Sequence, residues 1–260
     1  MKYIFIFSAL LLIIGGCSKA TNQKEASFDN STLINIKSND NVWFNKNVSF
    51  TKSSAITIFV DNKLNGSDGS SVGQQIVQAL PIAVRYLNNL TPNIKINSVS
   101  WGDSVPALGT SYSIVIRGDN SGASSAPAFA HIPAGNGNTG DLISINKDCN
   151  QSFLSWIHVY YTRLLVHEML HTLGYAHTGA VSYGDYDANA GEMAVPNPNQ
   201  TPQNADSSIM ESYHAFPSLI GYGGGPADFD TGANPYYIFT KGDLSMLNWY
   251  YKLSPPYNIY

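Results

Sequence analysis

The 260-residue sequence predicts an α+β fold: a mixed, twisted sheet of about five strands with two long helices, followed by an irregular C-terminal subdomain with a final helix. Three observations predict it. Short β-branched runs bounded by turn residues surround one helical stripe in the first half of the chain. A second, longer apolar stripe begins at Ser152. Beyond residue 177, Gly, Asn, Asp and Pro dominate and regular periodicity is lost.

The N-terminal residues 1–17 have the pattern of an export signal. Lys2 precedes an apolar run of about a dozen residues that ends in Gly15-Gly16-Cys17, which is typical of a secretory signal. The run is short for a membrane-spanning helix. Its end resembles a bacterial lipobox, which implies lipidation of Cys17, export and a membrane-anchored lipoprotein of the cell envelope or cell surface. An ordinary signal peptide with an incidental cysteine is the alternative.

The composition narrows the class of partner. The formal net charge is −4, and charged residues make up 12% of the chain, about half the usual share. A mildly acidic chain without a basic patch argues against a nucleic-acid partner. Hydrophobic residues, at 43%, are sufficient for a sizeable core. The chain has only two cysteines, Cys17 and Cys149. If Cys17 is lipidated, Cys149 has no intrachain disulfide partner and is expected to be a small buried apolar residue.

The domain boundaries follow from composition. Residues 18–52 are rich in Ser, Asn, Lys and Thr with little periodicity, and they are predicted to be a tether or a short pro-segment. A tether is favoured, because cutting away a pro-segment would remove the lipid anchor. The folded domain is predicted at 53–260, with an N-terminal subdomain at 53–174 and a C-terminal subdomain at 175–260.

Local patterns predict the elements of the N-terminal subdomain. A helix begins at Ser71, and Pro81 is expected to kink it or to disturb its third turn. One strand is closed by Pro133, and proline is tolerated at a sheet edge. The five predicted strands are short, apolar and bounded by turn residues, at 55–60, 94–101, 112–117, 128–133 and 141–146.

The second long helix ends in an H-E-x-x-H-x-x-G-x-x-H motif. His167 and His171 lie about 40° apart around an α-helix, so both rings leave one face and suit two ligands of one tetrahedral zinc ion. Gly174 can end the helix in the left-handed conformation. His177 can then return as the third ligand, and three protein ligands leave the open position of a catalytic site. Glu168 is the candidate general base.

Two segments follow the motif. Residues 184–202 are irregular and rich in Gly and Pro, which is typical of a functional wall or lid. A final helix is predicted from Thr240 to Tyr251, where Thr240 and Asp243 resemble a capping box.

The motif together with Ser208-Ile209-Met210 resembles the metzincin clan of zinc endopeptidases, whose long histidine motif is followed by a methionine turn. The resemblance covers roughly residues 53–255. It implies that the three histidines bind one catalytic zinc, that Glu168 is the base, and that Met210 lies beneath the ligands without binding the metal. Other branches of the clan place an oxyanion-assisting tyrosine two residues after the methionine. Here Tyr213 is the candidate, three residues after it.

Within the clan, the sequence is similar to the matrixins. Thr178 follows the third histidine, where that branch has Ser or Thr, and residues 128–133 with Gly140-Asp141 resemble its edge strand and the strand after it. Matrixins also hold a second, structural zinc, which needs several His and Asp ligands. That zinc is not expected here, because only His131 lies in the corresponding region. The resemblance implies that an extended substrate pairs antiparallel with the edge strand at Phe129, Ala130, His131 and Ile132.

The sequence therefore predicts a monomeric zinc endopeptidase that hydrolyses extracellular or surface proteins. A zinc amidase or hydrolase acting on cell-wall peptide or another non-protein substrate, and a catalytically idle surface lipoprotein that binds a partner, remain open alternatives. Calcium remains open too, since loops rich in Asp, Asn and Gly suit hard cations and ordinary turns equally well. These loops are 118–121, 135–141 and 184–189.

Overall fold

The computed structural model is a mixed α/β structure with one five-stranded sheet, one three-stranded sheet and two long helices. The residues that it describes are 42–44, 55–67, 71–119, 127–133, 137–148, 157–178, 193–195, 209–210, 229–232, 238–239, 243–244, 247 and 251. In chain order the elements are β1 (Val42–Phe44), β2 (Ile56–Asp61), η2 (Asn62–Leu64), α1 (Ser71–Leu90), β3 (Ile96–Gly102), β4 (Ile114–Asp119), β5 (Ala128–Ala130), β6 (Leu142–Asn146), α2 (Ile157–Thr172), β7 (Tyr175–Thr178), β8 (Met193–Val195) and η5 (Phe229–Thr231).

The five-stranded sheet has the order β3-β2-β4-β6-β5. Its first four strands are parallel, and β5 pairs antiparallel with β6 at one edge. The predicted mixed sheet of five strands is therefore confirmed. Residues Ile114–Ile116 of β4 and 142–145 of β6 are buried without alternation, which is typical of parallel strands.

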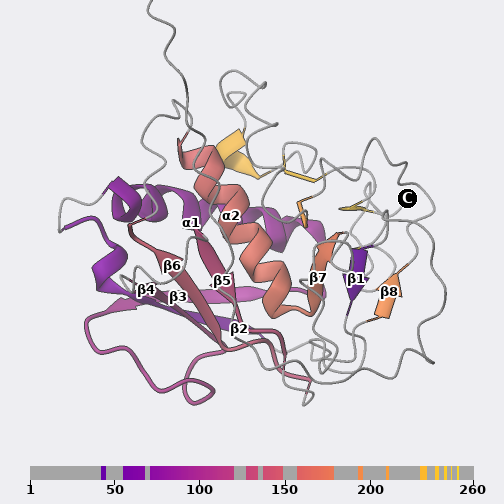
Figure 1. Ribbon diagram of the computed structural model, residues 1–260, viewed down its shortest axis with the longest axis horizontal. Helices are drawn as coiled ribbons and strands as arrows, with labels where there is room; N and C mark the ends of the chain where they lie inside the picture. Colours follow the sequence, from indigo (N-terminus) through magenta and orange to yellow (C-terminus); the bar gives the residue numbers. More distant parts are fainter. Residues whose placement is uncertain are drawn as a thin grey trace, which may run out of the picture.

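Both long helices cover the same face of this sheet (Figure 1). Apolar side chains of β2, β4 and β6 form one core with those of α1 and α2. Full burial of one such side chain contributes about 1.5–3 kcal/mol, so this layer holds the sheet and helices together. Helix α1 continues from Ser71 to Leu90 with Pro81, which is exposed, inside it. No helix in the described ranges is long and apolar enough to cross a membrane.

A second, three-stranded sheet with the order β7-β1-β8 lies beyond the C-terminal end of α2 (Figure 1). Strand β1 pairs antiparallel with β7, with Val42 opposite Thr178 and Phe44 opposite Tyr175. It belongs to the segment 18–52, so a strand of the fold precedes the boundary predicted at residue 53. Three residues give too few positions for periodicity to reveal a strand. The other residues of 18–52, and 1–17, lie outside the described residues.

The final helix contacts the C-terminal ends of α1 and α2. Its described residues, Asp243, Leu244, Leu247 and Tyr251, are helical and buried. The Tyr251 hydroxyl donates to the carbonyl of Leu173 at 2.9 Å, and the Tyr251 carbonyl accepts from the hydroxyl of Thr91 at 2.8 Å. One residue of the final helix therefore connects the ends of both long helices.

The connection before β6 packs directly against the end of α2. The Gly140 N–H donates to the Thr172 carbonyl at 2.8 Å, and a Cβ at Gly140 would lie 1.7 Å from the carbonyl oxygen of His131. Only a residue without a side chain fits here. The end of the edge strand, this glycine and the end of α2 are therefore in backbone contact.

We expect Gly140→Ala to destabilise the protein by at least about 3 kcal/mol, because both groups that meet the new methyl are backbone and cannot rotate away. Urea unfolding of purified protein measures this. Gly118→Ala is the matched control: there the nearest atom is the Cδ of the flexible Lys147 side chain, so a smaller loss is expected. Equal losses in the two variants would contradict the prediction.

Candidate metal centre

His167 and His171 lie one turn apart on the C-terminal half of α2, and both are buried, with 4% and 8% of their surface exposed. Their Nε2 atoms face each other at 3.0 Å, and the rings are nearly perpendicular. The helical spacing of four residues thus brings the two nitrogens to one point, as the sequence predicts.

Both rings are oriented through their other nitrogen. The Nδ1 of His167 lies 2.6 Å from the carbonyl oxygen of Ile209, and the Nδ1 of His171 lies 2.6 Å from that of Tyr175. A carbonyl oxygen only accepts, so each Nδ1 carries the proton. Histidines that bind metals usually donate their other N–H in this way, which fixes the tautomer and the ring orientation.

This hydrogen bonding leaves the lone pair of each Nε2 directed at the other ring. Two lone pairs at 3.0 Å repel each other unless a cation lies between them, either a proton shared by the rings or a metal ion. Two nitrogens of a tetrahedral zinc site, each about 2.0–2.1 Å from the metal, are about 3.3 Å apart. The pair therefore fits two zinc ligands after a shift of a few tenths of an ångström.

Glu168 is buried beside the pair, with 3% of its surface exposed. Its Oε2 has no hydrogen-bond partner among the described residues. Burial without a partner disfavours the carboxylate and raises the pKa of Glu168 from 4.5 to about 8. A cation close to this group would favour the ionised form. The buried carboxyl group of Glu168 and the facing Nε2 atoms thus both indicate a site for positive charge.

The third predicted ligand, His177, lies on β7, whose backbone pairs with β1. Its side chain is outside the described part of the chain. Helix α2 ends at Thr172, and Gly174, which was expected to end it, has a φ of 103° and donates its N–H to the His171 carbonyl at 2.9 Å. Among the side chains that the structure describes, no group of three His, Cys, Asp or Glu lies close enough to hold a metal.

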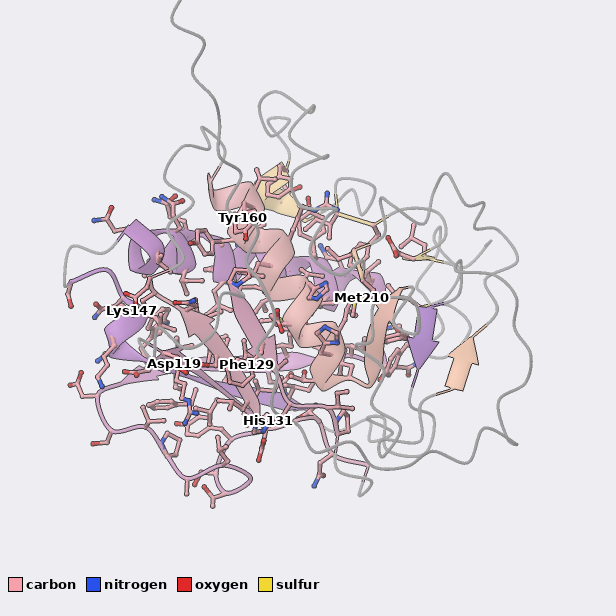
Figure 2. The ribbon with its side chains drawn as sticks, in the orientation of Figure 1. Asp119, Phe129, His131, Lys147, Tyr160 and Met210 are labelled. Atoms are coloured by element: carbon pink, nitrogen blue, oxygen red, sulfur yellow. The ribbon has the colours of Figure 1, made fainter. Side chains whose placement is uncertain are left out.

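Met210 lies beside the second half of α2 (Figure 2). Ile209 and Met210 form a turn and are completely buried, and both belong to the same core as α2. The carbonyl of Ile209 is the acceptor for His167. The turn that the resemblance singles out therefore contacts the motif through its backbone as well as by packing.

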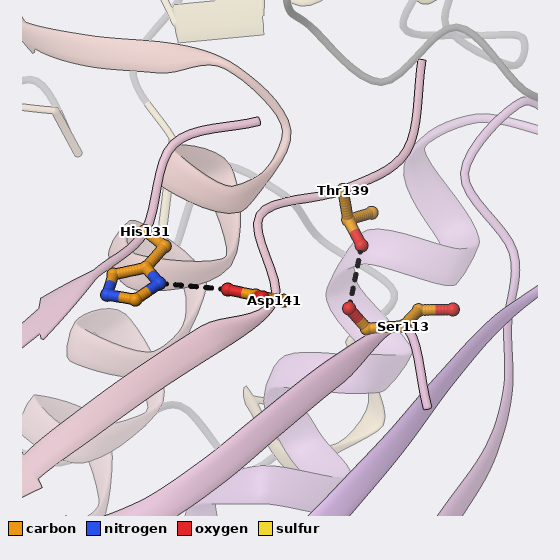
Figure 3. Close-up of polar contacts among 4 residues, drawn as sticks. All are labelled: Ser113, His131, Thr139 and Asp141. Carbon is orange, nitrogen blue, oxygen red and sulfur yellow. Dashed lines mark hydrogen bonds and ion pairs between the residues drawn. The ribbon is translucent and has the colours of Figure 1, made fainter. Parts of the chain in front are cut away.

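The predicted substrate-pairing residues lie on and just after β5, at the edge of the sheet. Phe129 is 40% exposed. The ladder to β6 continues beyond the strand, because the His131 N–H donates to the Leu142 carbonyl at 2.9 Å. The His131 ring and the Asp141 carboxylate point toward each other at 2.8 Å (Figure 3). This side-chain contact joins the end of β5 to the start of β6.

Tyr213, Cys17 and Cys149 lie outside the described residues, as does the segment 184–189 considered for calcium. Residues 209 and 210 are described, whereas Ser208 is not.

Three groups at this centre were not predicted from the sequence. Two are the carbonyl oxygens of Ile209 and Tyr175, and a backbone acceptor has no residue-type signature. The third is Asp243, which the sequence suggested only as part of a capping box. Its Oδ2 accepts the Ile209 N–H at 3.1 Å. No local pattern indicates a contact between residues 34 positions apart.

No protein-family model matches the sequence, and no curated protein matches it. Among solved structures, the chain is similar to that of myroilysin, with a TM-score of 0.32 and 14% sequence identity over 66% of this chain and 74% of that chain. A likeness of this extent does not distinguish one chemistry from another.

We expect Glu168→Gln to raise the stability of the metal-free protein at pH 7 by about 1–3 kcal/mol. Burial raises the pKa of Glu168 to about 8, so this residue must take up a proton when the protein folds at pH 7, whereas a neutral amide does not. Urea unfolding at pH 7 in excess chelator measures the change. Asp148→Asn, which alters an exposed carboxylate, is the control and should leave stability within about 0.5 kcal/mol of the parent. A Glu168→Gln protein no more stable than the parent would show that the carboxylate is already compensated.

Proposed function

We propose that the protein is a zinc-dependent endopeptidase of the metzincin type, with His167, His171 and His177 as ligands and Glu168 as general base. The observation that carries the proposal is the facing pair of Nε2 atoms, 3.0 Å apart, on rings whose Nδ1 protons are held by carbonyls. This arrangement supports a cation between the rings. Glu168 directly follows His167, and its buried carboxyl group can act as a base. This supports a hydrolytic metal site over a purely structural one.

A bound zinc ion would polarise the scissile carbonyl and lower the pKa of a coordinated water toward about 7. Glu168 takes the proton from the attacking water and passes it to the leaving amine. Its burial keeps bulk water away from the carboxylate, so the proton passes between the reacting groups. The carbonyls of Ile209 and Tyr175 hold the two rings in the tautomer that presents Nε2.

The edge strand β5 provides a backbone on which an extended substrate can pair. The Pro127 carbonyl and the His131 N–H both bond to β6, so residues 127, 129 and 131 face that strand. Backbone groups alternate in an antiparallel ladder, so those of Ala130 face away from β6. We therefore assign Ala130, rather than Phe129, as the residue whose backbone bonds the substrate, while the exposed Phe129 side chain contacts it.

Replacement of the base tests the mechanism. We expect Glu168→Gln to bind zinc with the parent stoichiometry and to lose at least about 100-fold in casein cleavage, because the general base is lost while the ligands remain. Atomic absorption and a fluorescent casein assay give the two readings. Asp148→Asn should cleave at the parent rate. Cleavage at the parent rate by Glu168→Gln would exclude this role, and a zinc-bound parent that cleaves no peptide would favour one of the other predicted classes.

Removal of one outward N–H tests the edge strand. We expect Ala130→Pro to lower kcat/KM for casein about three- to tenfold, the effect of one lost hydrogen bond, because proline is tolerated where the N–H faces away from the sheet. The melting temperature should stay near that of the parent. Ala130→Val keeps the N–H and is the control. If both variants lose activity equally, side-chain size and not the hydrogen bond explains the loss.

A further inference from the structure

The final helix places a buried carboxylate beside the candidate metal centre. Asp243 is 0% exposed, and its Oδ2 accepts the N–H of Ile209 at 3.1 Å. The carbonyl of the same Ile209 accepts from the Nδ1 of His167 at 2.6 Å. Ile209 is therefore held at its N–H by a carboxylate and at its carbonyl by a ring.

A buried carboxylate is costly unless it is hydrogen-bonded, and the Ile209 N–H supplies such a bond to Asp243. A hydrogen bond to an ionised acceptor is roughly twice as strong as one to a neutral acceptor. This gives the Ile209 turn a firmer position than packing alone, and the Ile209 carbonyl sets the direction of the His167 ring. Small displacements of that carbonyl would turn Nε2 away from the point that it shares with His171.

We infer that Asp243 is a positioning residue that fixes the ring of His167 through Ile209 and thereby sets the metal affinity of the centre. The inference rests on the proposed function in taking His167 as a zinc ligand.

The final helix is held against the rest of the domain by contacts other than that of Asp243. The Tyr251 hydroxyl bonds to the Leu173 carbonyl, and the Thr91 hydroxyl bonds to the Tyr251 carbonyl. Leu244 and Leu247 are buried in the common core. These contacts remain when the carboxylate of Asp243 is removed, so the helix is expected to stay in place while the Ile209 turn loosens.

Zinc affinity tests the inference. We expect Asp243→Ala to raise the zinc dissociation constant of the full chain about tenfold or more, the usual effect of losing an outer partner of a ligand. Asp243→Asn keeps a neutral acceptor and should lie between Asp243→Ala and the parent. Competition with a chromophoric chelator measures all three proteins. A dissociation constant within about twofold of the parent in Asp243→Ala, or in Asp243→Asn where Asp243→Ala does not fold, overturns the inference.

Tyr86→Phe is the matched control. It removes one buried hydrogen bond, from the Tyr86 hydroxyl to the Phe229 carbonyl at 2.9 Å, that involves neither Ile209 nor a histidine. It should lower the melting temperature and leave the zinc dissociation constant unchanged. If Tyr86→Phe weakens zinc binding as much as Asp243→Ala does, general destabilisation explains both variants and the positioning role is wrong.

A second measurement, the hydrogen-exchange rate of the His167 ring, tests this inference independently of the proposed function. In the metal-free parent, the Nδ1 proton of His167 is hydrogen-bonded and buried, so its NMR signal should exchange slowly with water. Asp243→Ala should speed that exchange at least about tenfold, because the acceptor is no longer held. A parent protein that binds no zinc defeats the proposed function, and the exchange rate still tests the link. An unchanged exchange rate overturns the inference.

Discussion

Two hydrogen bonds from imidazole rings to backbone carbonyls hold the centre together. They join the α2 residues His167 and His171 to Ile209 and Tyr175. Each bond contributes only about 1 kcal/mol to stability, so their importance is geometric. They decide which ring nitrogen carries the proton and where Nε2 points. The turn at Ile209, the strand β7 and the final helix all serve to keep these two carbonyls in place.

The same centre lowers the stability of the folded protein. The carboxyl group of Glu168, whose Oε2 has no hydrogen-bond partner among the described residues, is buried beside two Nε2 atoms 3.0 Å apart, and burial is unfavourable for both. The apolar core of α1, α2 and the sheet offsets this. A single cation would compensate both unfavourable features at once. Net stability is small compared with these terms, so tolerating such a site points to function rather than to packing.

The features that could be predicted from the sequence are those that neighbouring residues encode. The five strands of the main sheet and helix α1 follow from runs and stripes only a few residues long. His167, Glu168 and His171 are visible because one helical turn brings them together. Strand β1 was missed, since Val42–Phe44 is too short to show a period. The carbonyl acceptors could not be predicted, because any residue has a carbonyl and only the tertiary fold selects which one.

Asp243 is the clearest example of a contact that could not be predicted from the sequence. Its spacing from Thr240 indicated a local role at a helix start, whereas its carboxylate bonds Ile209, 34 residues away. Tyr251 likewise bonds Leu173 across 78 residues, just after helix α2. The last residues of the domain thus complete the surroundings of the motif. A helix with two correctly spaced histidines is therefore not yet a metal centre. The ring orientations exist only once these long-range contacts have formed, so any metal that binds between the rings would be linked to folding of the whole domain.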